Sequence, residues 1–109
     1  MSYEIKLLPI VHKDLRKAKK WYSDKNQELA NDFKIEVNKE IEYIGNFPEH
    51  YQRKYKEFRQ SLVTRFPYAI FYLIEEEQKR VVIFGVLHTS RNPEIVRKRM
   101  LLPNLHQKQ

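Results

Sequence analysis

The sequence contains no cysteine, only two glycines and no long uncharged apolar run. Without cysteine it can form neither a disulfide nor a thiolate metal site. Two glycines are too few for a Gly-rich phosphate loop or a flexible linker. No stretch approaches the roughly 20 apolar residues of a membrane span, and residues 1–6 show no signal-peptide core. We therefore expect a cytoplasmic protein without cofactor, metal or membrane association.

Positive charge predominates in this chain. Lys and Arg number 21 against 14 Asp and Glu, which gives a formal net charge of +7. Such a balance favours an acidic partner, either nucleic acid or an acidic protein segment, over a neutral one. A basic surface that only keeps the protein in solution is the alternative. The 109 residues suit one domain over residues 1–109, with order expected from about 3 to 102.

Two amphipathic helices are predicted in the first half, over residues 11–24 and 27–44, because apolar side chains recur there every three or four residues. These side chains are Leu15, Ala18 and Trp21 or Tyr22 in the first helix, and Leu29, Phe33, Val37, Ile41 and Ile44 in the second. The short connection at 24–26 predicts an antiparallel helix hairpin. Gly45 stands where a C-terminal helix cap is expected.

Four strands are predicted, over residues 3–8, 55–65, 67–75 and 81–88. The last is apolar on both faces and should be central. Asn92-Pro93-Glu94 is typical of a helix start. The order predicts an α+β domain with an N-terminal strand, a helix hairpin packed on one face of a mainly antiparallel four-stranded sheet, and a short C-terminal helix. The tail after Pro103 is expected to be frayed.

His88 and Arg91 are the first candidates for chemistry, at the end of the last predicted strand. A histidine moves protons near neutral pH, and an arginine holds a phosphate or carboxylate with two hydrogen bonds. Together they could bind RNA or catalyse its cleavage, which needs a base, a phosphate clamp and an acid. The alternative is a histidine that anchors a turn beside a surface arginine.

Arg59 and Arg65 are predicted on the sheet face opposite the helices. Six residues of strand separate them by roughly 20 Å, so they cannot share one phosphate. A tight hairpin around Phe66 would place Arg65 near His88 and Arg91, and these three would form the catalytic set of a ribonuclease. Arg59, Arg65 and Arg91 would bind nucleic acid or a protein partner. For Arg65 the alternative is a solvated charge at a strand end.

Aromatic residues interleave with basic ones at Tyr51, Tyr55, Tyr68 and Tyr72. Bases stack on such surfaces in single-strand binding proteins, but strands are rich in half-buried aromatics for packing reasons alone. Glu36 and Glu40 are interpreted as exposed residues of the second helix.

Several short motifs follow one another along the chain. They are Asp14-Leu15-x-x-Ala18-x-x-Trp21-Tyr22, Leu29-Ala30-x-x-Phe33, Phe47-Pro48-x-x-Tyr51, Arg59, Phe66-Pro67-Tyr68-x-Ile70-x-Tyr72 and His88-x-x-Arg91-x-Pro93. This ordered set, from about residue 3 to 100, resembles the RelE/ParE family of bacterial toxins. The resemblance implies the α+β toxin fold, a place in a type II toxin–antitoxin (plasmid-stabilisation) module, and a cognate acidic antitoxin that wraps the toxin.

The family divides by activity, and the resemblance favours its ParE-like branch. ParE-like members poison DNA gyrase and show no nuclease activity, whereas RelE-like members cleave mRNA on the ribosome. Ribonuclease members commonly carry Tyr-Arg-x-x-Tyr in the third strand, where this chain has Ala69 after Tyr68. Gln60 and Leu62 stand where those enzymes tend to place lysines.

Three functions are therefore considered. The first is a ParE-like toxin that inhibits growth through DNA gyrase and is not an enzyme. The second is a RelE-like endoribonuclease that acts on ribosome-bound mRNA through Arg65, His88 and Arg91. The third is a non-toxic basic domain that binds only its antitoxin or nucleic acid.

Overall fold

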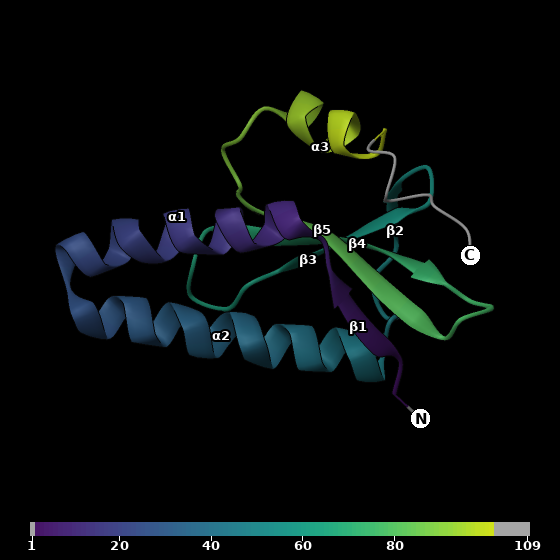
Figure 1. The fold of residues 1–109 in the computed structure, drawn as a ribbon, viewed down its shortest axis with the longest axis horizontal. Coiled ribbons are helices and arrows are strands. Elements are labelled where there is room, and N and C mark those ends of the chain that lie inside the picture. The colour runs from purple at the N-terminus through teal and green to yellow at the C-terminus, as the bar shows by residue number, and fades with distance from the viewer. Residues whose placement is uncertain (1, 102–109) are drawn as a thin grey trace.

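The computed structural model describes residues 2–101 (Figure 1). The element order is β1 (Glu4–Leu7), α1 (Pro9–Lys25), α2 (Gln27–Asn46), β2 (Arg53–Tyr55), β3 (Phe58–Leu62), β4 (Tyr68–Glu75), β5 (Arg80–His88) and α3 (Pro93–Arg99). The expectations for residue 102 and for the tail after Pro103 lie outside the described residues.

The strands form one sheet in the order β1-β5-β4-β3-β2. β1 runs parallel to β5, and the other neighbours are antiparallel. The predicted α+β fold class is thus confirmed, and β5 is the interior strand that its apolar faces predicted. The sheet has five strands rather than four. The predicted strand 55–65 is broken because Lys56 takes a φ of 53° and turns the chain, so that Tyr55 pairs with Phe58.

The helix hairpin has a connection of a single residue, Asn26. Its side chain accepts the Glu28 N–H (2.8 Å) and its own N–H donates to the Tyr22 carbonyl (2.8 Å), so it ends α1 and caps α2. Gly45 is not a C-terminal cap, as the sequence had suggested, but lies inside α2. A Cβ there would meet Ile5 Cδ1 at 3.2 Å, so the glycine allows α2 to approach β1 closely.

The apolar stripes of the hairpin pack against one face of the sheet. Phe33, Val37 and Ile44 on α2 are buried, as predicted. On α1 the alternative between Trp21 and Tyr22 is resolved, since Tyr22 is buried and Trp21 is 56% exposed. Phe33 packs edge-on against Phe66 (5.3 Å between ring centroids). The tip of the hairpin projects beyond the sheet (Figure 1).

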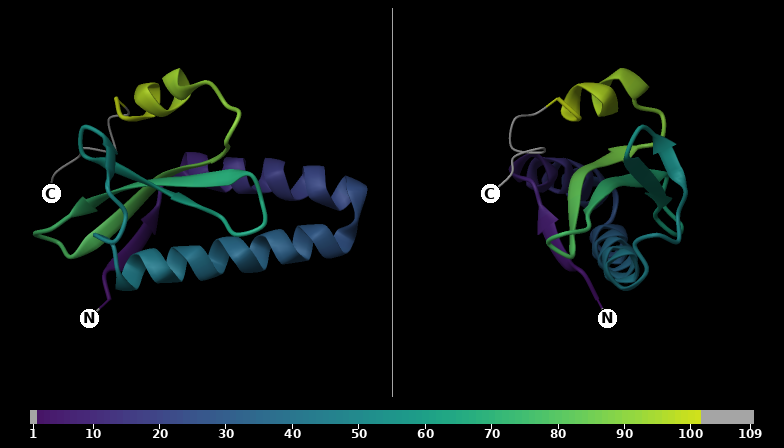
Figure 2. Two further views of the ribbon diagram at one scale, coloured as in Figure 1. Left: turned by 180° about the vertical axis from the view of Figure 1, so that it is seen from behind. Right: turned by 90° about the vertical axis from the view of Figure 1, so that its right-hand side faces the viewer.

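α3 lies on the other side of the sheet from α2 (Figure 2). It begins as predicted, because the Asn92 side chain accepts the Glu94 N–H (2.9 Å). Val96 and Met100 are buried in the core. The sheet is therefore covered by helices on both faces, and the segment after β5 leads from the sheet to α3 (Figure 2).

Candidate functional site

Two cavities flank residues 88–91, the segment that follows β5. The first, which we call the α1 cavity, has a volume of about 360 Å³ and is lined by Asp14, Lys17, Ala18, Trp21, Tyr22, Pro67, Tyr68, Val86, Leu87, His88, Ser90 and Arg91. The second, the α3 cavity, has about 350 Å³ and is lined by Lys54, Tyr55, Phe58, Gln60, Ala69, Phe71, Leu87, His88, Thr89, Arg91, Pro93, Val96 and Arg97. His88 and Arg91 line both.

His88 anchors the turn after β5. Its Nδ1 accepts the Ser90 N–H (3.1 Å) and lies 2.8 Å from Ser90 Oγ. Its ring meets Tyr68 edge-on, with centroids 5.3 Å apart. A ring nitrogen that accepts a backbone N–H carries no proton, so a neutral His88 holds its proton on Nε2. In this arrangement His88 presents a donor rather than a base to the cavities.

Arg91 is held in place by its backbone, whose N–H donates to the His88 carbonyl (3.0 Å). Its side chain is exposed and pairs with no other residue in the described range 2–101. Burial raises the pKa of the nearby Tyr68 hydroxyl, and the positive charge of Arg91 opposes that effect. Arg91 is thus a free cation beside a partly buried phenol.

Arg65 comes to the same end of the sheet as His88, because the Thr89 N–H donates to the Pro67 carbonyl (2.9 Å). It takes a φ of 73°, and its guanidinium lies 3.5 Å from the Asp32 carboxylate of α2. It lines neither cavity. The structure therefore brings together His88 and Arg91 and directs Arg65 away from them. A catalytic role for these residues stays a prediction.

The expectation that Arg59 and Arg65 lie on the sheet face opposite the hairpin is corrected, since Arg65 reaches Asp32 of α2. Arg59 does not lie on that face either. It pairs across the sheet with Tyr72 and shares its face with Ser61, which is buried against α2. Arg59 donates to the Tyr51 carbonyl (2.5 Å), so it braces the loop after α2. Glu36 and Glu40 were expected to be exposed, but both are half-buried. Glu40 accepts hydrogen bonds from Tyr51 (2.6 Å) and Ser61 (2.7 Å).

The tyrosines predicted to interleave with basic residues do not form one surface. Tyr72 is fully buried and donates to the Pro48 carbonyl (2.7 Å), and burial raises its pKa to about 12. Burial and the bond to Glu40 raise the pKa of Tyr51. Tyr55 is 39% exposed at the α3 cavity, with Arg97 over its ring.

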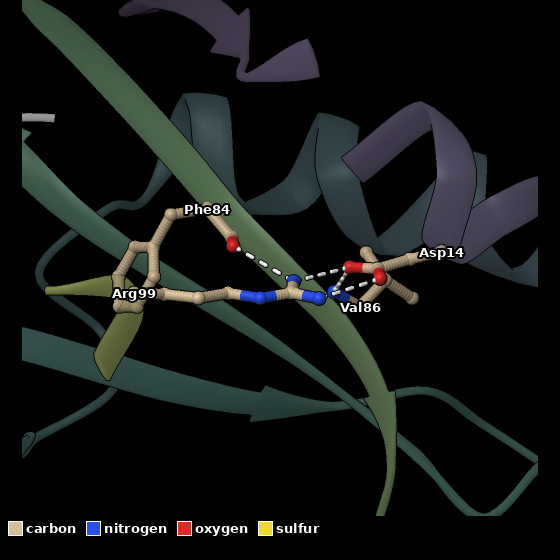
Figure 3. A network of polar contacts seen from close by, with 4 residues as sticks. All are labelled: Asp14, Phe84, Val86 and Arg99. Carbon is tan, nitrogen blue, oxygen red and sulfur yellow. Dashed lines mark hydrogen bonds and ion pairs between the residues drawn. The ribbon is translucent and has the colours of Figure 1, made fainter. Parts of the chain in front are cut away.

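A polar network that sequence reasoning missed joins α1 to α3 (Figure 3). Arg99 donates to both carboxylate oxygens of Asp14, at 2.6 and 2.9 Å, and to the Phe84 carbonyl at 3.2 Å. Asp14 also accepts the Val86 N–H at 3.0 Å. A Cβ at Gly85 would lie 3.3 Å from Arg99, so the glycine makes room for the guanidinium. Asp14 is thereby neutralised, although it lines the α1 cavity.

Two further classes of site find no support in the described residues. Within residues 2–101, no group of three or more His, Asp or Glu side chains could hold a metal ion. No helix in that range combines the length and apolar character needed to span a membrane.

Comparison with known proteins places the chain in a family. The model of the ParE toxin of type II toxin-antitoxin system, parDE, matches residues 5–93. Among curated proteins, none matches the sequence significantly.

Solved structures share the fold. A chain of the chromosomal ParDE TA system from P. aeruginosa has 13% identity, with 80% of this chain and 96% of that chain covered and a TM-score of 0.70. The isolated E. coli RelE toxin has 15% identity, coverage of 92% and 100%, and a TM-score of 0.60. A chain of the RelBE2 toxin-antitoxin complex from Mycobacterium tuberculosis has 17% identity, coverage of 81% and 92%, and a TM-score of 0.57.

Proposed function

The chain belongs to the ParE toxin family of type II toxin–antitoxin systems, and on that premise we propose that it inhibits DNA gyrase and is neutralised by a cognate acidic antitoxin. Inhibition of this kind is binding to a macromolecular target and requires no chemistry by the toxin. The protein would then act in the cytoplasm, where both the target and the antitoxin are found.

The choice of DNA gyrase over ribosome-bound mRNA as the target rests on Ala69. It is buried in the α3 cavity beside Gln60 and Leu87. The family resemblance implies an arginine at this position in ribonucleases, where it would face a phosphate. Here a methyl group joins Phe58, Phe71 and Leu87 in the cavity floor, so no guanidinium is present at this position, although Lys54, Arg91 and Arg97 line the same cavity.

The titratable groups around the α3 cavity also favour binding over proton transfer. The lining contains His88 and Tyr55 but no carboxylate. His88 uses Nδ1 to anchor its own turn. RNA cleavage needs an acid and a base on either side of a phosphate, and among the described residues this lining holds no carboxylate to act as the base. A ParE-like inhibitor needs none.

A RelE-like endoribonuclease acting on ribosome-bound mRNA is the second candidate. One observation favours it: His88 and Arg91 line the same cavity, so a proton donor and a phosphate ligand lie side by side. In that case Arg91 would bind the phosphate and the Nε2–H of His88 would serve as the acid.

Induced expression in a bacterial host separates the two candidates. We expect growth arrest with loss of plasmid supercoiling while mRNAs stay intact, and rescue by co-expression of the antitoxin. Cleavage of mRNA at ribosomes, with normal supercoiling, would assign the protein to the second candidate. Unimpaired growth would contradict both.

A further inference from the structure

The lining of the α1 cavity includes charged and polar side chains that have no interaction partner among residues 2–101. Lys17 and Arg91 are exposed cations, and neither side chain pairs with another residue within 2–101. Tyr22 and Tyr68 also line this cavity, and their hydroxyls form no hydrogen bond with the described residues. The cavity therefore presents two positive charges and two phenols to whatever enters it.

Aromatic rings form part of the remaining wall of the α1 cavity. Trp21 is 56% exposed at its rim and packs edge-on against Tyr22, with centroids 5.1 Å apart. Tryptophan is among the residue types that are enriched at the binding hot spots of protein interfaces. A ligand with an apolar or aromatic side chain would cover Trp21 and the ring of Tyr68.

Asp14 supplies the one carboxylate that residues 2–101 contribute to this lining, and it does not repel an anion. Asp14 is held by both terminal nitrogens of Arg99 and by the Val86 N–H. Its charge is therefore compensated inside the protein, and the net charge exposed at the rim is positive. Since the whole chain carries a formal charge of +7, an acidic partner is steered toward this protein as well.

We propose that the α1 cavity receives the antitoxin, through a segment that places a carboxylate between Lys17 and Arg91 and an adjacent apolar or aromatic side chain against Trp21. This assignment rests on the proposed function, since it names where the neutralising partner docks. A volume of about 360 Å³ is suited to one or two side chains of an inserted segment.

Arg91 links the two cavities, so a partner bound in the α1 cavity also affects the α3 cavity. Arg91 lines both cavities, which lie on opposite faces of the sheet end. A carboxylate that binds Arg91 in the α1 cavity withdraws its charge from the α3 cavity. Occupation of the α1 cavity would therefore change the charge of the α3 cavity without filling the α3 cavity itself.

The test uses the toxin and the purified product of the adjacent open reading frame, with affinity measured by calorimetry. We expect Lys17→Glu and Trp21→Ala each to weaken binding by about tenfold or more. The matched control is Lys13→Glu, which makes the same charge change one turn earlier on α1 and does not line the cavity. It should weaken binding by no more than about threefold.

Trp21 also provides a direct signal, because it is the only tryptophan of the chain. Its fluorescence should shift when the partner binds. Wild-type affinity in both cavity variants, with gyrase inhibition still relieved by the partner, would overturn this site and leave the proposed function intact. No binding of the partner to wild-type toxin would overturn both. A Lys17-dependent fluorescence shift with a single-stranded oligonucleotide, and none with the acidic protein, would assign the cavity to nucleic acid.

Discussion

Asp14 and Arg99 form a buried ion pair that joins the first helix to the last across 85 positions of sequence. Their side chains are only 8% and 13% exposed. Both also form hydrogen bonds with the backbone of β5, the strand that ends at His88: Asp14 accepts the Val86 N–H, and Arg99 donates to the Phe84 carbonyl. The bond therefore fixes α1, β5 and α3 relative to one another, and with them the walls of both cavities.

Replacing Asp14 by Ala should destabilise the fold by about 3–5 kcal/mol, because Arg99 would be left buried without a counter-charge. Denaturation in urea measures the change in the free energy of unfolding. The control is Lys20→Ala, which removes an exposed pair with Asp24 and should cost no more than about 1 kcal/mol. Equal, small effects in the two variants would show that the Asp14–Arg99 pair does not hold the elements together.

Phe33→Ala should cost about 3–5 kcal/mol, since Phe33 is fully buried between the helix hairpin and the sheet. Ile35→Ala is the matched control on the same helix, because Ile35 is 54% exposed. Thermal unfolding of both variants checks the prediction. An unchanged melting temperature for Phe33→Ala would mean that the face of α2 has been assigned wrongly.

Stability should fall at alkaline pH. Burial raises the pKa of Tyr72 to about 12, above the value of about 10 for a tyrosine in an unfolded chain. The folded state therefore favours the protonated phenol, whose contribution is complete below pH 10 and is lost as the pH rises toward 12. Tyr51, whose pKa is also raised, acts in the same direction.

Urea denaturation from neutral pH to pH 11 measures this dependence. Tyr72→Phe cannot ionise, so its unfolding free energy should fall less steeply above pH 10 than that of the wild type. Parallel curves for the two proteins would contradict the assignment of alkaline sensitivity to Tyr72.

His88→Asn tests whether proton transfer is needed for toxicity. The Asn side-chain oxygen can replace Nδ1 as the acceptor for Ser90 and so preserve the turn, but it cannot exchange a proton as imidazole does. We expect most of the growth inhibition to remain. A loss of roughly 10²–10⁴-fold in the rate of mRNA cleavage would instead identify His88 as a general acid or base.

The parts of the fold that depend on local patterns were predicted well from the sequence. Apolar spacing placed Phe33 in the core, and Asn92 before Pro93 marked the start of α3, because helix stripes and caps involve residues a few positions apart. The face of Arg59 was predicted wrongly. The alternation of side chains along a strand shows which residues share a face, but not which of the two faces packs against a helix. Ser61 marks the face that packs against α2, but it is a small polar residue whose burial against Glu40 is not evident from the sequence.

The candidate site was predicted only in part. His88 and Arg91 were found because they end an apolar strand, and the structure places them side by side at both cavities. The pair of Asp14 and Arg99 gives no local signal, although Asp14 is the only acid among the basic residues from 13 to 20. Contacts between such distant residues depend on how the sheet brings β5 between α1 and α3.

Gyrase inhibition by the purified protein is the most direct test of the account. Negative supercoiling of relaxed plasmid by purified gyrase should be inhibited by the toxin and restored by the acidic product of the neighbouring frame, while ribosome-bound mRNA incubated with the same toxin stays uncut. Undiminished supercoiling at toxin concentrations that cleave ribosome-bound mRNA would contradict the account.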